Sequence, residues 1–511
     1  MLLCWLLFIP FIGGLACWAT SRGRDNAGLA RVIAFLSMAA VFVPAVVVWF
    51  TGDFSLSGDP SVAPAWQYEI AADWISQFGI EFHLALDGLS LVMVMLASVL
   101  GMLSVVASAS TVKSRVGVFH ANLLWTLGGV IGIFLAIDLF LYFFFWELML
   151  IPMYFLIALW GHEENDRSTN TAAAVKFFIY TQTSGLAMLA AILGLVFLHY
   201  DQSGVLTFDY NQLLTTDTSG AFGMVLMLGF FLAFAVKLPA VPFHGWLADT
   251  QANAPTSGAV DLSGILVKTA AYGLLRFALP LFPEASANFA PVAMTLGLIS
   301  IYYGAVMAFA QNDIKRLISY SSISHMGFAL VGLYAGTMLA LQGVVLQVLA
   351  SAVSTAALFI LAGQLYERMG TRDMRALGGL FGRLGALPGF SLVFVVASLG
   401  MPATGNFLGE FLILFGAFAT HPWFVVIAAG GMILAAVYAL YMMHRVYWGT
   451  PDAGGTIANM RAREYTMMMA LVLITLILGL FPNTVLHVTQ TVTHDISSWF
   501  AAGVIAAAQA S

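Results

Sequence analysis

Three ionisable side chains lie within long apolar segments. Glu147 ends the run Phe140-Leu-Tyr-Phe-Phe-Phe-Trp-Glu147, and Lys237 and Lys268 each lie deep inside a segment of their own. A charge at the centre of a bilayer costs roughly 2.5–3.5 kcal/mol on insertion scales, so such a group usually has a function. A lysine beside a carboxylate can change its protonation state when the partner moves. Glu147 and Lys237 are therefore predicted to transfer protons as a charge pair; the alternative is a static ion pair that fixes helix packing.

A second group of polar residues follows Lys268. His325 ends the stretch Ser319-Tyr-Ser-Ser-Ile-Ser-His325, and the next apolar segment carries polar side chains at helical spacing: Gln347, Ser351 and Ser354. Polar residues that recur at i, i+4 and i+7 share one helix face. We expect this face to point into the protein and to hold waters that connect Lys268 to His325. Alternatively, the hydroxyls bond to their own helices or join neighbouring helices.

Glycine and proline interrupt two of the apolar segments. The first break is Lys237-Leu-Pro239-Ala-Val-Pro242-Phe-His-Gly-Trp, and the second is Gly400-Met-Pro402-Ala-Thr-Gly-Asn-Phe-Leu-Gly-Glu410. Proline breaks the backbone ladder of a membrane helix, and the freed groups can bind water or ions. Each break carries one ionisable residue, Lys237 or Glu410. Paired broken helices in two halves of a chain are typical of inverted-repeat transporters, although a single break can also be a simple kink.

The composition indicates which solvent surrounds these segments. Of 511 residues, 61% are hydrophobic and only 9% are charged, whereas soluble domains carry about 25% charge. The surface must therefore face lipid. The chain contains no basic run, so a nucleic-acid partner is not expected. The two cysteines, Cys4 and Cys17, have no spacing suited to a metal or an iron–sulfur cluster.

The sequence is predicted to form a single, all-α, polytopic transmembrane domain over residues 1–511. About 20 apolar residues are needed to cross the hydrocarbon, and about 14 segments meet that length. They are approximately 2–19, 29–50, 83–108, 118–136, 138–160, 172–198, 222–243, 256–280, 290–310, 317–336, 341–366, 386–416, 423–447 and 465–489.

The lysines and arginines predict the orientation of the chain. If the spans alternate, most of the 19 fall in connections on one side: Arg22, Arg24, Arg31, Lys113, Arg115, Arg167, Lys315, Arg316, Arg368, Arg372, Arg375, Arg383, Arg445, Arg461 and Arg463. The connections 51–82 and 199–221 contain none. The positive-inside rule places the basic side in the cytoplasm and both termini outside. Arg276 is expected at the outer end of its span, where a long side chain can snorkel.

Several motifs resemble the antiporter-like membrane subunits of respiratory complex I, the NADH:quinone oxidoreductase. They are Leu127-Gly-Gly-Val-Ile-Gly-Ile-Phe, Phe145-Trp-Glu147-Leu-Met-Leu-Ile-Pro-Met-Tyr, the stretch from Lys237 to Trp246, Ala254-Pro-Thr, Lys268-Thr-Ala-Ala-Tyr-Gly-Leu-Leu-Arg276, the stretch from Asp313 to Gly327, and Pro402 to Phe411. The resemblance extends over nearly the whole chain. Glu410 stands where sister subunits carry lysine, and in this it resembles one branch of the family.

The resemblance implies a fold and a role for each site residue. Two inverted five-helix repeats, at about 118–280 and about 290–447, would each contain a broken helix. Helices in 1–117 and 465–489 would flank them, followed by a C-terminal tail, 490–511. Five residues would translocate protons: Glu147 and Lys237 as the input charge pair, Lys268 and His325 as the central relay, and Glu410 as the output carboxylate.

The resemblance also implies partners. The chain would lie in the bacterial inner membrane with both termini periplasmic, beside other complex I membrane subunits, in particular two sister antiporter-like subunits on either side. It would hold no cofactor, because NADH, FMN, iron–sulfur clusters and quinone would belong to other subunits.

The sequence departs from the family at two positions. Ser351 and Gln251 stand where the family usually has histidine. Neither side chain titrates near neutral pH, so a central relay that needs imidazoles must run through water here.

Two alternative functions share many of these motifs. The chain could be a subunit of a multisubunit Na⁺/H⁺ antiporter, or a membrane arm that has a structural role and does not pump. Glu410 and the full-length resemblance favour the proton pump.

Overall fold

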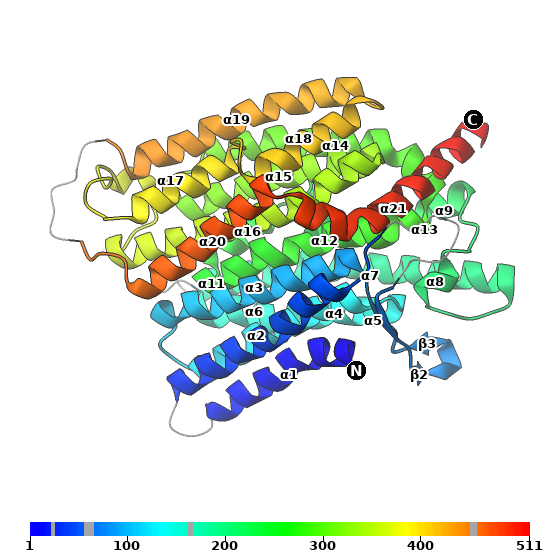
Figure 1. Cartoon of the computed structure of the whole chain (residues 1–511), viewed down its shortest axis with the longest axis horizontal. Coiled ribbons are helices and arrows are strands. Elements are labelled where there is room, and N and C mark those ends of the chain that lie inside the picture. The colour runs from blue at the N-terminus through cyan, green and yellow to red at the C-terminus, as the bar shows by residue number, and fades with distance from the viewer. Residues whose placement is uncertain (22–25, 56–65, 162–166, 450–456, 511) are drawn as a thin grey trace.

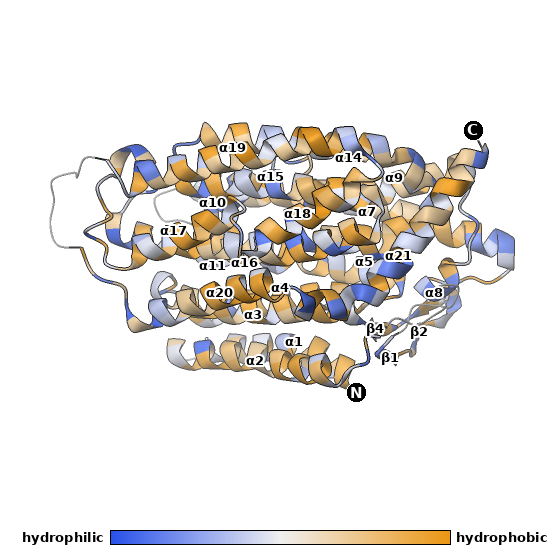
Figure 2. Cartoon of the chain, turned by 45° about the horizontal axis from the view of Figure 1, so that its top comes forward, coloured by the Kyte–Doolittle hydropathy of each residue, from blue (hydrophilic) through white to orange (hydrophobic). Residues whose placement is uncertain are grey.

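The computed structural model describes residues 1–21, 26–55, 66–161, 167–449 and 457–510. Its helices run roughly side by side along the long axis of an elongated bundle (Figure 1). Hydrophobic residues cover the length of the bundle, and hydrophilic residues gather toward its two ends (Figure 2). This distribution is the one a bilayer requires, since apolar side chains face acyl tails and polar residues reach water.

The structure contains the spans that the sequence predicts. Within the described residues, twelve are long and apolar enough to cross a membrane: α1 (Leu2–Thr20), α2 (Ala27–Thr51), α3 (Gly88–Thr111), α4 (Val116–Leu135), α5 with α6 (Leu139–Leu148, Leu150–Trp160), α7 (Arg167–Ser203), α9 (Gly220–Lys237), the span Thr256–Leu281, α14 (Pro283–Phe309), α16 (Met338–Met369), α19 (Pro422–Val446) and α20 (Ala462–Leu480). With α15 (Ile314–Ala335) and the interrupted pair α17 (Leu387–Ser398) and α18 (Gly405–Phe418), they account for the 14 predicted segments.

Both predicted helix breaks are confirmed. α9 ends at Lys237, and a run of turns containing Pro239 and Pro242 separates it from α10 (Leu247–Asn253). α17 ends at Ser398 and α18 begins at Gly405, with Gly400 between them at a φ of 74°. A positive φ suits glycine because it has no Cβ. Each break therefore leaves an ionisable residue beside non-helical backbone.

The span Thr256–Leu281 lies wholly inside the bundle and is irregular. It consists of α11 (Thr256–Asp261), the π-helical segment η2 (Leu262–Leu266), α12 (Val267–Gly273), a second π-helical segment η3 (Leu274–Ala278) and α13 (Leu279–Leu281). π-Helical turns inside α-helices are rare and are frequent at functional sites. Lys268 lies in the short α-helical piece between them.

Small elements form the two ends of the bundle. The connection before α3 contains the strand pairs β1–β4 (Tyr68–Ile70, Leu84–Leu86) and β2–β3 (Asp73–Ile75, Ile80–Glu81), with the 3₁₀ turn η1 (Ser76–Phe78). The all-α prediction did not include these strands. They lie at the same end as α8 (Tyr210–Leu213), and both termini lie toward that end (Figure 1). The 3₁₀ turn η4 (Met374–Ala376) follows α16.

Three details differ from the sequence prediction. The last span ends at Leu480 instead of residue 489, because Pro482 follows it, and α21 then runs over Asn483–Ala510. Arg276 does not snorkel: it is buried and paired with the Asp87 carboxylate. Lys315 lies buried in the first turn of α15 and not in a connection, donating to the Ala254 carbonyl at 2.9 Å. Two of the basic residues, Arg22 and Arg24, fall outside the described residues.

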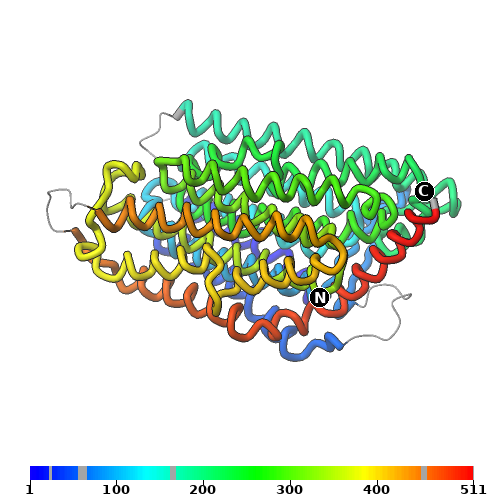
Figure 3. The backbone as a smooth tube through the Cα atoms, turned by 90° about the horizontal axis from the view of Figure 1, so that it is seen from above, coloured from blue at the N-terminus to red at the C-terminus, as the bar shows by residue number. Residues whose placement is uncertain are grey.

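Glycines let the helices of the second half approach closely. An ideal Cβ on Gly409 of α18 would lie 2.7 Å from the backbone of Gln347 on α16, and one on Gly343 would lie 2.6 Å from the Ile413 nitrogen. Small residues at helix crossings allow this contact in membranes, where packing drives association. Viewed at a right angle, α7 and α20 lie at opposite edges with the central helices between them (Figure 3).

We expect Gly409→Leu to separate α18 from α16. Overpacking of a tight contact typically costs about 1–3 kcal/mol, so the purified complex should show a lower midpoint of thermal unfolding and less subunit in the membrane. Gly389→Ala on α17 is the matched control, because its Cβ would meet nothing within 4 Å. Equal unfolding midpoints for the two variants would contradict the close packing described here.

Candidate functional site

Glu147 lies on α5, one residue before the end of the helix. Neither carboxylate oxygen makes a well-formed hydrogen bond within the described part of the chain, although the Gln182 amide on α7 comes near. A Cβ placed on Gly185 of α7 would overlap its Oε1 atom. The carboxylate therefore occupies space that only a glycine at position 185 leaves open.

Lys237 is the last residue of α9 and is 1% exposed. Its Nζ lies 3.5 Å from the centre of the Trp146 ring and 3.9 Å from the Met149 sulfur. A cation over the face of a tryptophan is attracted by the ring quadrupole, most strongly away from water. Lys237 thus contacts residues on both sides of Glu147 in the chain. The charged atoms of Lys237 and Glu147 nevertheless form no ion pair within 4.0 Å among the described residues.

This separation matters for chemistry. A tight buried ion pair would hold both charges in place. Here the ammonium rests on neutral groups and the carboxylate lacks a firm donor, so a small movement of either side chain changes the field at the other. Neither charge is therefore fixed by an ion pair with the other.

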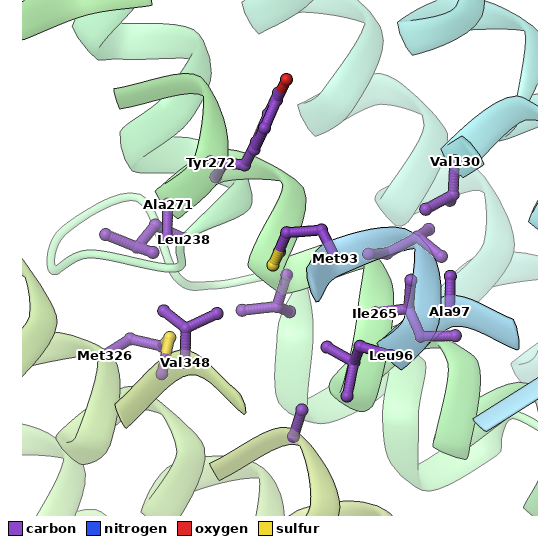
Figure 4. Packing of buried hydrophobic residues seen from close by; sticks show 14 of the residues in the cluster. Met93, Leu96, Ala97, Val130, Leu238, Ile265, Ala271, Tyr272, Met326 and Val348 are labelled. Carbon is purple, nitrogen blue, oxygen red and sulfur yellow. The ribbon is translucent and has the colours of Figure 1, made fainter. Parts of the chain in front are cut away.

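Lys268 is fully buried on α12, and its Nζ lies 3.8 Å from the sulfur of Met326 on α15. Apolar side chains from several elements meet in this region, among them Leu238, Ala271, Met326 and Val348 (Figure 4). Leu238 directly follows Lys237, and Met326 directly follows His325. Lys268 therefore lies between the part of the chain that carries Lys237 and the part that carries His325.

His325 and Glu410 form a buried pair. His325 Nδ1 lies 2.9 Å from Glu410 Oε1, and both residues are 2% exposed. Gln347 on α16 donates to the same carboxylate oxygen at 2.9 Å. Ser398 and Tyr438 approach the other imidazole nitrogen, at 3.3 and 3.4 Å. A histidine between a carboxylate and hydroxyl groups can pass a proton from one ring nitrogen to the other side.

The polar face of α16 points toward α18. Asn406 donates to Ser354 at 3.0 Å, one turn of helix from Glu410, in addition to the contact made by Gln347. Ser351 bonds instead to the Val348 carbonyl of its own helix, as the alternative interpretation of the serines proposed. Ser321 likewise bonds to the Ile318 carbonyl of its own helix. Some of the polar side chains therefore contact a neighbouring helix, and others bond to their own helix.

The two departures from the family lie in different surroundings. Gln251 on α10 is fully buried, and neither its oxygen nor its nitrogen has a hydrogen-bond partner in the described ranges. Buried amide groups are nearly always bonded to protein or to ordered water. A polar position without a protein partner is suited to binding water.

The five predicted residues come from five helices: α5, α9, α12, α15 and α18. The structure pairs His325 directly with Glu410, whereas Lys268 meets the neighbouring residue, Met326, and not the imidazole itself. Glu147 and Lys237 are neighbours without an ion pair. Apart from the His325–Glu410 pair, the acids and bases are separated, so protons can pass between them only if water or side-chain motion closes the gaps.

Sequence reasoning missed two charged groups. Asp261 is fully buried and accepts a hydrogen bond from Ser104 at 2.7 Å. Its signal was a carboxylate inside an apolar segment, the same signal that identified Glu147. Asp249 on α10 binds both Lys176 and Arg316 at 2.6 Å, and no sequence spacing joins these three residues.

Comparison with known proteins places this arrangement in a family. The family model described as "NADH:quinone oxidoreductase/Mrp antiporter, TM" matches residues 136–436, more than half of the chain. NADH-quinone oxidoreductase subunit M of Pseudomonas aeruginosa is 56% identical, with 98% of each chain covered.

Two solved structures have the same fold. A chain of respiratory complex I from Thermus thermophilus with bound NADH has a TM-score of 0.86 at 29% identity, covering 98% of this chain and 100% of that one. A chain of the Mrp complex from Dietzia sp. has a TM-score of 0.81 at 18% identity, covering 98% and 99%. At this lower identity the second similarity shows the fold alone. The chain belongs to the family of NADH-quinone oxidoreductase subunit M, an antiporter-like, multi-pass membrane subunit of bacterial respiratory complex I.

Proposed function

We propose that this subunit translocates protons through Glu147, Lys237, Lys268, His325 and Glu410, driven by NADH oxidation and quinone reduction in other subunits. The observation that carries the proposal is the Glu147 carboxylate, buried beside a lysine yet without a firm hydrogen-bond donor among the described residues. A structural carboxylate in such surroundings would be expected to have its oxygens satisfied.

The spacing of the five groups supports transfer in steps. Protons enter at Glu147 and Lys237, move to Lys268, and leave through His325 and Glu410. Water bridges the intervals, since no direct hydrogen bond joins Lys268 to either neighbour in the described residues. Moving the proton of one pair shifts the charge state of the next, because electrostatic coupling is strong where water is excluded.

The proposal also covers the internal repeats, the orientation in the membrane and the partner subunits. Residues 118–280 and 290–447 form two inverted repeats, and each contains one of the observed helix breaks. Both termini face the periplasm, at the end that carries the short strands. The neighbouring subunits are the two sister antiporter-like chains, and NADH, FMN, iron–sulfur clusters and quinone bind elsewhere in the complex.

The alternative function is a subunit of a multisubunit Na⁺/H⁺ antiporter. Its support is the fold shared with the Mrp complex chain. No particular contact in the described residues favours Na⁺ over H⁺ as the transported ion. Measurements in sodium-free buffer separate the two, because an antiporter subunit requires Na⁺ to move protons.

We expect Glu147→Gln to lower NADH-driven proton uptake into inside-out vesicles and quinone reduction together, each at least about fivefold, because general acid–base groups typically contribute about 10²–10⁴-fold. The complex should still assemble, since glutamine keeps the shape of the side chain. Asp201→Asn, at the exposed end of α7, is the matched control and should leave both rates unchanged. Rates at the wild-type level in intact Glu147→Gln complexes would make Glu147 a packing residue.

We also expect Gly185→Ala to impair pumping without altering any ionisable residue. The added methyl group must displace the Glu147 carboxylate, so proton uptake should fall several-fold while the complex remains assembled. Gly194→Ala on the same helix is the control, because its methyl group meets the flexible end of Leu226. If the two alanine variants pump equally well, the exact position of the Glu147 carboxylate is unimportant.

A further inference from the structure

Asp261 is a buried carboxylate that the five-residue path does not use. It ends α11, directly before the π-helical segment η2, and is fully buried. Its Oδ1 accepts from Ser104 of α3 at 2.7 Å, whereas Oδ2 has no hydrogen-bond partner in the described residues. A carboxylate that is half satisfied at this depth has either a proton or water on its second oxygen.

Other buried polar atoms on the same span and on the neighbouring α16 also lack protein partners in the described residues. Thr256, Ser257 and Ser263 on the same span and Gln364 on α16 each have side-chain atoms that make no hydrogen bond within the described ranges. Ser257 precedes Asp261 by four residues and so shares its helix face. Such a concentration of polar atoms is the environment in which buried water is held, since each water needs two to four polar partners.

A narrow cleft leads toward these atoms from the surface. It lies where α3, α11, α16 and α20 meet and has a volume of about 10 Å³, room for about one water molecule; Ser110, Thr256, Gln364 and Glu367 are among the residues that line it. Glu367 is exposed and accepts a hydrogen bond from Ser110. The cleft opens at the end of the bundle that carries the basic connections, and its inner wall reaches the first turn of α11.

Asp261 also connects to the central part of the path. Lys268 lies seven residues further along the same span, about 10 Å along a helix axis at 1.5 Å per residue. The π-helical segment η2 separates the two residues. Wider turns of this kind re-aim side chains and loosen the backbone ladder. Asp261 is thus placed between a surface cleft and the lysine at the centre of the bundle.

We propose that Asp261 is a second proton-uptake residue, which delivers protons from the Glu367 cleft to Lys268 independently of Glu147. Cleft water takes up a proton from the bulk and passes it to the Asp261 carboxylate, which becomes the neutral acid while the water returns to its neutral form. The acid then passes the proton through water to the neutral Lys268 amine, which becomes an ammonium and restores the carboxylate. One proton moves from bulk water to Lys268 in each cycle. This inference rests on the proposed function, because Lys268 is its acceptor.

The test uses the intact complex in inside-out vesicles. Asp261→Asn should assemble and lower NADH-driven proton uptake by about threefold or more, a smaller loss than the roughly 10²–10⁴-fold typical of a general acid–base group, because the Glu147 route remains. Asp261→Glu should restore most of the loss. A double variant, Thr256→Val with Gln364→Leu, should have a similar effect without changing a titratable group. Thr475→Val, on the outer helix α20, is the control and should behave as wild type.

Infrared difference spectra provide a readout that a packing role would not change. Reduction of the wild-type complex should alter a carboxylic-acid C=O band that is absent from the Asp261→Asn complex. Wild-type uptake in Asp261→Asn, or in the double variant when Asp261→Asn fails to assemble, overturns the inference. So does an unchanged C=O band. If Glu147→Gln alone is impaired, only this inference fails; if neither variant is impaired, the proposed function fails as well.

Discussion

The structure depends on the cost of placing charge in a medium that contains little water. An ionisable side chain cannot face lipid, so every helix that carries one must turn that face inward and surround it with other helices. This constraint explains why the span with Lys268 is completely enclosed while α1, α2 and α19 expose much of their apolar surface. The bundle is arranged around its buried charges, and the outer helices isolate them from the bilayer.

The buried charges are treated in two different ways. Arg276 is tied to Asp87, and Arg368 is tied to Glu464 at 2.5 Å, so each cation has a fixed partner. Lys237 and Lys268 have no such partner in the described residues and rest instead on an aromatic ring or on methionine sulfur. Polarizable neutral groups moderate the cost of a cation without fixing it. That distinction separates charges that hold the fold from charges suited to move a proton.

Breaks in the helices allow these positions to exist. α9 and α17 both stop inside the bundle, and π-helical turns lie on both sides of α12. An unbroken helix satisfies all its backbone groups and offers none to water. Where the ladder is interrupted, backbone carbonyl and amide groups can bind water instead of each other. The irregular segments thus lie beside ionisable residues: the first break follows Lys237, and the π-helical turns lie on both sides of the helix that carries Lys268.

The sequence by itself determined the number of spans, the two breaks and the identity of the ionisable residues, because each leaves a local signal: an apolar run, a proline or a charge among apolar neighbours. Only the tertiary structure decided how these residues meet. His325 binds Glu410, 85 residues away, and Glu147 fits against Gly185 on another helix. Helix packing sets such contacts, and no spacing along one helix encodes them. The same reason explains why the cleft beside Thr256 was found only once α3, α11 and α16 were placed together.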